Sequence, residues 1–161
     1  MRRNYSRKKG GFTITELMTS VAIIGTLSGV AMPSYFKQAQ KARQSDVSNQ
    51  INQILTTIQA YREEFLENPS SWNDLARITP VKQEKGIAKG SGYSTISSPN
   101  GGYYSIQIKE GSKYNPFAIT ALPKQKSQAG WGIKACINTE TGVAEIRKQT
   151  PGSSMQNPIC S

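Results

Sequence analysis

Lys8 to Gln38 reads KKGGFTITELMTSVAIIGTLSGVAMPSYFKQ, and its pattern decides how the chain is organised. Two lysines and two glycines precede a long apolar run that contains a single acid, Glu16. Residues 17–36 carry no charge over twenty positions, and a helix of that length spans about 30 Å of hydrocarbon. The sequence therefore predicts a helix that can cross a membrane.

Basic residues are concentrated in front of this helix. Five of them come before residue 12 with no acid among them, whereas Lys37, Lys41 and Arg43 follow the helix more sparsely. Positive charge beside a membrane span favours the cytoplasmic side. We therefore expect a single pass with the N-terminus in the cytoplasm and the rest of the chain outside. The five residues are Arg2, Arg3, Arg7, Lys8 and Lys9.

Glu16 needs an explanation, because burying a carboxylate in lipid costs about 3 kcal/mol or more unless a cation neutralises it. A simple signal peptide is one alternative, since Gly29-Val30-Ala31 loosely matches a cleavage site and would leave a chain beginning at Met32. A permanent anchor whose Glu16 reaches the interface is another. A cut after Gly11 would instead free the amine of Phe12, one helical turn before Glu16, as a cationic partner.

Gly11-Phe12-Thr13-Ile14-Thr15-Glu16-Leu17 resembles the class III signal of type IV pilins and pseudopilins. In that family a short basic leader ends in glycine, a phenylalanine or similar residue follows, and glutamate is the fifth mature residue. Thr15 departs from the pattern, because an aliphatic residue is commoner there. The resemblance implies a leader of residues 1–11 cut after Gly11, N-methylation of Phe12, and a Glu16 carboxylate that pairs with a neighbouring subunit's terminus during assembly.

The resemblance also implies a structural function. The chain would be a type IV pilus subunit, processed by prepilin peptidase and polymerised by the inner-membrane pilus assembly machinery into a homo-oligomeric extracellular filament for motility, adhesion or DNA uptake. The alternative is a minor pilin or pseudopilin whose basic head binds DNA or a surface ligand. The residues for that alternative are Lys124-Gln125-Lys126 and Arg147-Lys148, with Tyr103, Tyr104 and Trp131 near them in sequence.

Gly25, Gly29 and Pro33 interrupt the apolar half of the helix, residues 12–36. Each glycine costs about 1 kcal/mol in a helix and proline about 3 kcal/mol, so we expect the helix to bend or melt here. In pilins this segment is implicated in local unwinding on assembly. The alternative is a kinked transmembrane helix that packs through small residues.

The globular head is predicted to comprise residues 37–161. Apolar residues at spacings of three and four predict an amphipathic helix over 37–68, which should end near Asn68-Pro69. Residues 69–102 are expected to form a loop with a short capped helix beginning at Ser70-Ser71.

From residue 103 the apolar period changes to two, which predicts strands. We expect an antiparallel meander over 103–147 with strands near 103–109, 117–122, 131–138 and 143–147. Thr139 to Gly142 should form the last hairpin loop. The predicted fold class is α+β: a long N-terminal helix, its apolar half protruding and its amphipathic half packed against a four-stranded sheet.

The chain has no histidine and two cysteines, Cys136 and Cys160, among its 161 residues. This composition removes most zinc sites and the imidazole-dependent nucleophiles, so we expect no enzyme, no metal and no cofactor. The cysteines indicate one disulfide in an oxidising compartment, with two free thiols as the alternative. In pilins a C-terminal disulfide encloses the D-region, here 136–160. Major pseudopilins commonly lack it and bind calcium instead, which favours a pilus subunit.

Overall fold

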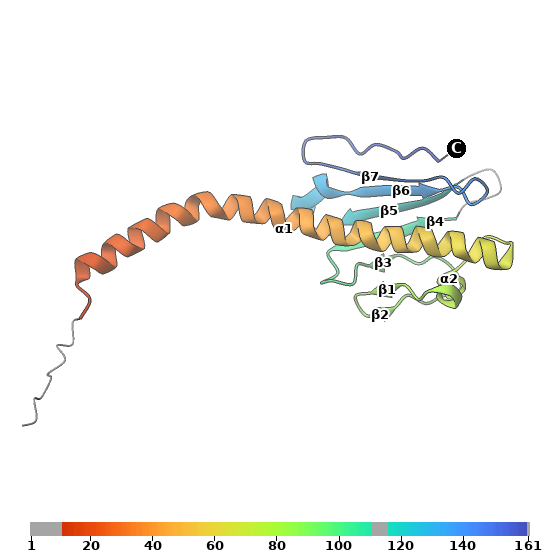
Figure 1. Cartoon of the computed structure of the whole chain (residues 1–161), viewed down its shortest axis with the longest axis horizontal. Helices are drawn as coiled ribbons and strands as arrows, with labels where there is room; N and C mark the ends of the chain where they lie inside the picture. The colour runs from red at the N-terminus through yellow and green to blue at the C-terminus, as the bar shows by residue number, and fades with distance from the viewer. Residues whose placement is uncertain (1–10, 111–115, 161) are drawn as a thin grey trace, which may run out of the picture. The chain divides into compact units, whose positions relative to one another are not determined.

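The computed structural model describes residues 11–110 and 116–160, so the basic cluster before Gly10 lies outside the described residues. The chain divides into two compact units, 1–38 and 39–161. Helix α1 spans Ile14–Phe65, runs through both units and contains Pro33 without a break in its secondary structure (Figure 1).

The long helix ends three residues earlier than Asn68. Leu66 adopts a positive φ of 59°, a left-handed conformation that stops an α-helix. Its backbone N–H still bonds to the Arg62 carbonyl at 2.9 Å, and the Arg62 guanidinium donates to the Leu66 carbonyl at 2.6 Å. These two bonds satisfy backbone groups at the helix end and fix the turn before Pro69.

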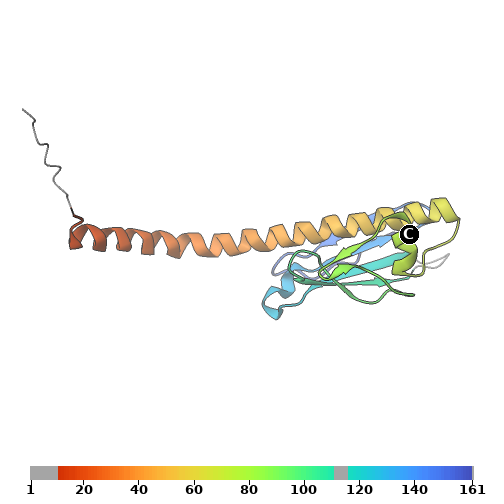
Figure 2. The ribbon, with the colours of Figure 1, turned by 90° about the horizontal axis from the view of Figure 1, so that it is seen from below.

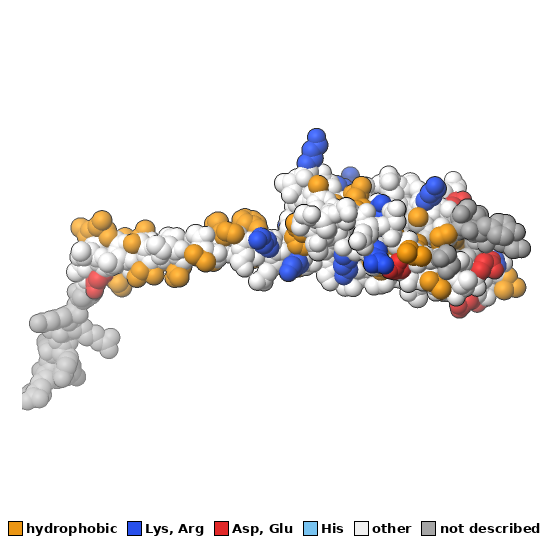
Figure 3. All heavy atoms as spheres, turned by 90° about the horizontal axis from the view of Figure 1, so that it is seen from above, with side chains coloured by type: hydrophobic (Ala, Val, Ile, Leu, Met, Phe, Trp, Pro, Cys, Tyr) orange, Lys and Arg blue, Asp and Glu red, His pale blue; other side chains and the backbone are white. Residues whose placement is uncertain are grey.

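The N-terminal unit exposes its apolar side chains. Every described residue from 11 to 38 is exposed, and Figure 3 shows hydrophobic side chains along this stretch of α1. The large ones are Phe12, Ile14, Leu17, Met18, Val21, Ile23, Ile24, Leu27, Val30, Met32, Tyr35 and Phe36.

In the head, one face of α1 is buried against the sheet. The helix lies across one side of the sheet in both ribbon views (Figure 1, Figure 2). Ile51, Ile54 and Ile58 are fully buried, one helical turn apart, so they form a continuous apolar row as the 3.6-residue period requires. The buried residues of the helix are Gln44, Val47, Ser48, Gln50, Ile51, Ile54, Leu55, Thr57, Ile58 and Tyr61.

Helix α2, Trp72–Ile78, confirms the predicted short capped helix. The Ser71 hydroxyl accepts from the Asp74 backbone N–H at 3.2 Å and donates to the Asp74 carboxylate at 2.8 Å. Trp72 is buried, its indole N–H donates to the Ser94 carbonyl at 2.9 Å, and its ring meets Tyr93 edge to face. The cap therefore starts the helix and the indole anchors it.

The main sheet is antiparallel and has the order β3-β4-β5-β6-β7. The prediction of four strands was wrong, because Ile96 pairs with Ile106 and adds a fifth strand of two residues. The residues around this strand are polar or glycine, so the sequence shows no alternating apolar pattern there. The bounds are β3 Ile96–Ser97, β4 Tyr104–Lys109, β5 Phe117–Pro123, β6 Ile133–Ile137 and β7 Ala144–Lys148.

Two short strands form a separate hairpin in the segment predicted as a loop. They are β1, Lys82–Gln83, and β2, Gly86–Ile87, paired antiparallel. Gly86 has a φ of 110°, which only glycine adopts at low cost, and this allows the tight connection.

The connection from β5 to β6 contains η1, a 3₁₀ helix over Lys126–Trp131. The prediction that the third strand begins at Trp131 was wrong. The Trp131 carbonyl accepts hydrogen bonds from the Gln44 amide at 3.1 Å and from the Tyr104 hydroxyl at 2.9 Å. Because side chains occupy this carbonyl, the strand ladder starts two residues later, at Ile133.

The β6–β7 hairpin follows the predicted loop. Gly142 has a φ of 71°, and its N–H donates to the Asn138 carbonyl at 2.8 Å. Arg62 of α1 forms an ion pair at 2.7 Å with Glu140 in this loop. The loop is therefore tied to the C-terminal end of the helix.

Candidate functional site

The N-terminal end of α1 is the candidate site, and Thr13 organises it. The Thr13 backbone N–H and hydroxyl both donate to one carboxylate oxygen of Glu16, at 2.9 and 2.8 Å. The Glu16 backbone N–H donates back to the Thr13 hydroxyl at 3.3 Å. This reciprocal pattern is a capping box, in which residues three apart satisfy the free N–H groups of a helix start.

The capping box gives Glu16 a role that the sequence interpretation missed. Glu16 has partners within its own chain before any neighbouring subunit is considered. A threonine followed three residues later by glutamate is the usual signature of this cap, and Thr13-x-x-Glu16 matches it. Glu16 therefore starts the helix locally, and pairing with an amine would have to share or replace these hydrogen bonds.

Three hydroxyl side chains inside the apolar stretch, those of Thr19, Ser20 and Thr26, donate to carbonyls of their own helix. The Thr19 hydroxyl donates to the Thr15 carbonyl at 2.8 Å, and the Ser20 hydroxyl donates to the Glu16 carbonyl at 2.7 Å. The Thr26 hydroxyl donates to the Ile23 carbonyl at 2.9 Å. Such internal bonds lower the cost of placing hydroxyl groups in hydrocarbon. Helix α1 is long and apolar enough to cross a membrane.

The predicted weak points of the helix are helical in the structure. Gly25, Gly29 and Pro33 all lie within α1, and a Cβ added at either glycine would meet no atom within 4 Å. Packing within the chain therefore does not require glycine at these positions. Bending or melting of this segment stays a prediction.

Cys136 and Cys160 form the predicted disulfide, with Cα atoms 6.0 Å apart. The C-terminal segment is held at further points, because the Ile159 N–H donates to the Glu145 carboxylate and the Lys134 ammonium donates to Asn157 at 2.7 Å. The Ile159 N–H holds the pKa of the Glu145 carboxyl below its usual value, and Arg147 acts in the same direction.

Several residues of the basic patch considered for DNA are buried or already paired within the chain. Tyr104 is fully buried and donates to the Trp131 carbonyl, so its ring cannot stack on a base. The Lys124 ammonium donates to Ser97 at 2.8 Å, and Arg147 pairs with Glu145. Within residues 11–110 and 116–160, no group of three or more acidic or cysteine side chains is arranged to hold a metal ion.

Comparison with known proteins gives two findings. Residues 6–32 match the family described as the prokaryotic N-terminal methylation motif. The chain is also 28% identical over 82 residues to the type IV major pilin protein PilA of Myxococcus xanthus (strain DK1622). That alignment covers 51% of this chain and 36% of the relative, so little more than a third of the relative is matched. No solved structure matches the chain significantly.

The matched residues, 6–32, include the Thr13–Glu16 capping box and most of the exposed apolar part of α1. The relative is a pilin by name. The chain therefore carries an N-terminal methylation motif over residues 6–32 and is similar, over about half of its length, to a type IV major pilin.

Proposed function

We propose that the chain is a subunit of an extracellular type IV pilus. In this proposal residues 1–11 are removed by a prepilin peptidase that cuts after Gly11, and the new terminus at Phe12 is N-methylated. Residues 12–36 hold the subunit in the inner membrane before assembly and then form the filament core. Residues 37–161 form the head on the filament surface.

One observation carries the proposal: Glu16 stands at the start of an otherwise uncharged and fully exposed apolar part of α1, residues 14–36. Phe12 is 88% exposed, and the large apolar side chains that follow it, from Ile14 to Phe36, are 59–82% exposed. Their burial requires lipid or other subunits. A helix that leaves lipid for an equally apolar filament core gains little hydrophobic free energy, so a specific ionic contact must favour transfer.

Glu16 supplies that contact in the proposed mechanism. Cleavage after Gly11 creates an amine at Phe12, and the carboxylate of one subunit neutralises the Phe12 amine of its neighbour. Pairing within an apolar core is strongly favoured over leaving either charge alone. The capping hydrogen bonds from Thr13 keep the carboxylate at the helix start, where it also suits the helix dipole.

Mass spectrometry of sheared surface filaments tests the proposal. The expected result is a dominant chain that begins with N-methyl-phenylalanine at position 12 and retains the Cys136–Cys160 disulfide. A chain beginning at Met32 would contradict it in favour of a simple signal peptide. The abundance of this chain in the filaments distinguishes a major subunit from a minor one.

A further inference from the structure

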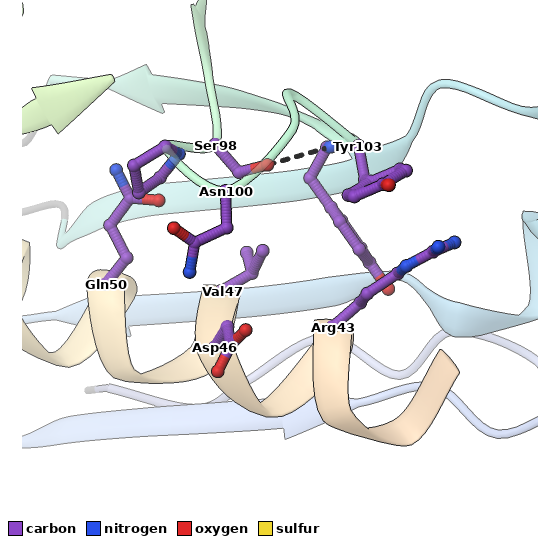
Figure 4. Close-up of a pocket in the computed structure, with 9 residues that line it drawn as sticks. Arg43, Asp46, Val47, Gln50, Ser98, Asn100 and Tyr103 are labelled. Atoms are coloured by element: carbon purple, nitrogen blue, oxygen red, sulfur yellow. Dashed lines mark hydrogen bonds between the residues drawn. The ribbon is translucent and has the colours of Figure 1, made fainter. Parts of the chain in front are cut away.

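The head contains a small pocket between α1 and the loop that joins β3 to β4. Its volume is about 130 Å³. Figure 4 shows side chains from the helix on one side and from the loop on the other. Its lining includes Arg43, Asp46, Gln50, Ser98, Asn100 and Tyr104.

Gln50 places an unpaired acceptor in this pocket. Its side chain is buried, with 7% exposed, and its Nε2 donates to the Lys82 carbonyl at 2.7 Å. A carbonyl cannot donate, so this bond fixes the amide with nitrogen toward Lys82. The oxygen has no hydrogen-bond partner among the described residues, and Figure 4 shows it on the side toward Asn100. Buried acceptors without a donor are rare in folded proteins. Four glutamine oxygens of the described residues are in this state, those of Gln40, Gln50, Gln59 and Gln128, and of these residues Gln50 is the one that lines the pocket.

The other polar groups of the pocket provide both donors and acceptors. Ser98 is buried, and its oxygen accepts from the Tyr104 N–H at 3.1 Å, which leaves the hydroxyl hydrogen available to an acceptor. Asp46 and Asn100 are exposed and form the mouth. The carboxamide of Asn100 can both donate and accept.

Arg43 and Tyr104 also line the pocket. The Arg43 guanidinium lies 3.8 Å from the Tyr103 ring centre, and within the described parts of the chain its N–H groups have no acceptor. Burial raises the pKa of Tyr104 to about 12, and its hydroxyl is used by the Trp131 carbonyl. Tyr104 therefore offers its ring to the pocket as an apolar wall.

Charge and size restrict the class of ligand. The pocket is lined by one positive side chain, Arg43, and one negative side chain, Asp46, so their formal charges cancel. A bound cation would be repelled by Arg43, and a bound anion would be repelled by Asp46. A neutral molecule that both donates and accepts hydrogen bonds fits this lining better than either. The volume is well below the roughly 300 to 1,000 Å³ of sites for drug-sized ligands, so it suits one small ring. We propose that this pocket binds a hydroxyl-rich ring of the size of one monosaccharide unit.

Nuclear magnetic resonance titration of the full chain tests this proposal. The ¹⁵N-labelled protein is held in a detergent without a sugar head group, and D-glucose, D-galactose, D-mannose and N-acetyl-D-glucosamine are added separately. At least one sugar should give saturable shifts with a Kd on the order of millimolar, as expected for so small a ligand. The shifts should be confined to amides near residues 43–50 and 98–104 and to the Gln50 side chain.

Variants with matched controls locate the binding. Gln50→Met should weaken binding about tenfold, the equivalent of one hydrogen bond, whereas Gln53→Met on the exposed face should not. Asn100→Ala should also weaken binding, whereas Asn49→Ala should not. Asn100 is exposed, so this second variant keeps the test valid if loss of the Lys82 bond unfolds Gln50→Met.

Three outcomes would overturn the proposal. The first is the absence of saturable shifts with all four sugars. The second is equal weakening by the control variants, which would place binding elsewhere. The third is a larger response of the same residues to n-butylammonium or butyrate, which would make the site one for charged ligands. None of these outcomes depends on filament assembly, so the proposed function stands or falls separately.

Discussion

The two halves of α1 share one continuous helical backbone, but the apolar side chains of the first half are exposed and those of the second half are buried in the head. Ile23, in the first half, is 59% exposed, whereas Ile54, in the second, is fully buried. Both are isoleucines in one continuous helix. The second half is stabilised by contacts that the chain provides itself. The first half needs lipid or other subunits, and in the proposed function it is the part that enters first the membrane and then the filament core.

The largest expected effect comes from removing the acid of the exposed half. Glu16→Ala leaves the Phe12 amine unpaired in the proposed filament core, and loss of one partner of a buried ion pair costs roughly 3 to 5 kcal/mol. The yield of sheared surface filaments should therefore fall below detection, while the amount of chain in the membrane is unchanged. Immunoblots of the two fractions measure this.

Two further variants separate pairing from helix capping. Glu64→Ala, an exposed acid in the other half of α1, should leave filament yield unchanged. Thr13→Ala removes the hydroxyl bond to Glu16 but keeps the backbone bond, so it should lower the yield less than Glu16→Ala. If Glu16→Ala formed normal fibres at the normal rate, the proposed pairing of Glu16 with the Phe12 amine would be contradicted.

The next largest effect should be confined to the head. The Cys136–Cys160 disulfide closes a loop across a sequence separation of 24, and such a loop contributes roughly 3 to 4 kcal/mol in the chain-entropy account. Cys136→Ser with Cys160→Ser should lower the free energy of unfolding by about that amount. Denaturant titration of the full chain in detergent, followed by fluorescence of buried Trp72, measures it. An unchanged midpoint would show that the other tail contacts suffice.

A smaller and more direct test of the comparison uses one substitution at two places. Ile54→Val should destabilise the head by about 0.5 to 1.5 kcal/mol, because it removes a methyl group from a packed core. Ile23→Val should leave unfolding of the head unchanged, because that side chain touches no core. The same denaturant titration decides it. Equal effects would mean that the exposed half contributes to the stability of the head.

Sequence patterns predicted the long elements well, because burial follows their period. The helix, the four longer strands and the disulfide all match expectation except at the C-terminal end of the helix and the ends of two strands. The two-residue strand at Ile96 was missed, since its pairing with Ile106 depends on tertiary contact and leaves no periodic signal. The strand start at Trp131 was wrong for the same kind of reason, because Gln44 and Tyr104 bind its carbonyl.

The sequence predicts residues for the candidate site but not their geometry. Gly11, Phe12 and Glu16 are predicted from the order of charge, glycine and apolar residues, and their roles in cleavage, methylation and assembly stay predictions. The contact between Thr13 and Glu16 could have been predicted from their spacing of three, which is the usual signature of a helix cap. The pocket at Gln50 could not be predicted, because its acceptor is unpaired only once the fold has directed the amide nitrogen to Lys82.

The smallest expected effect concerns how the free energy of unfolding of the head changes at acidic pH. Burial opposes ionisation of Asp74, but hydrogen bonds from Ser70 and Ser71 outweigh it and hold the pKa of the carboxyl below its ordinary value of 3.8. Since the folded pKa is the lower one, the contribution of Asp74 is fully present above pH 3.8 and is lost as pH falls through the folded pKa.

Asp74→Asn provides the comparison for this effect, because asparagine can still accept at the cap but does not titrate. At neutral pH the wild type should unfold at higher denaturant than Asp74→Asn, and this difference should shrink as the pH falls below 3.8. Asp46→Asn serves as the control, because Asp46 is exposed and accepts no hydrogen bond within residues 11–110 and 116–160. A difference that stays constant with pH would mean that the Asp74 carboxylate contributes nothing through its charge.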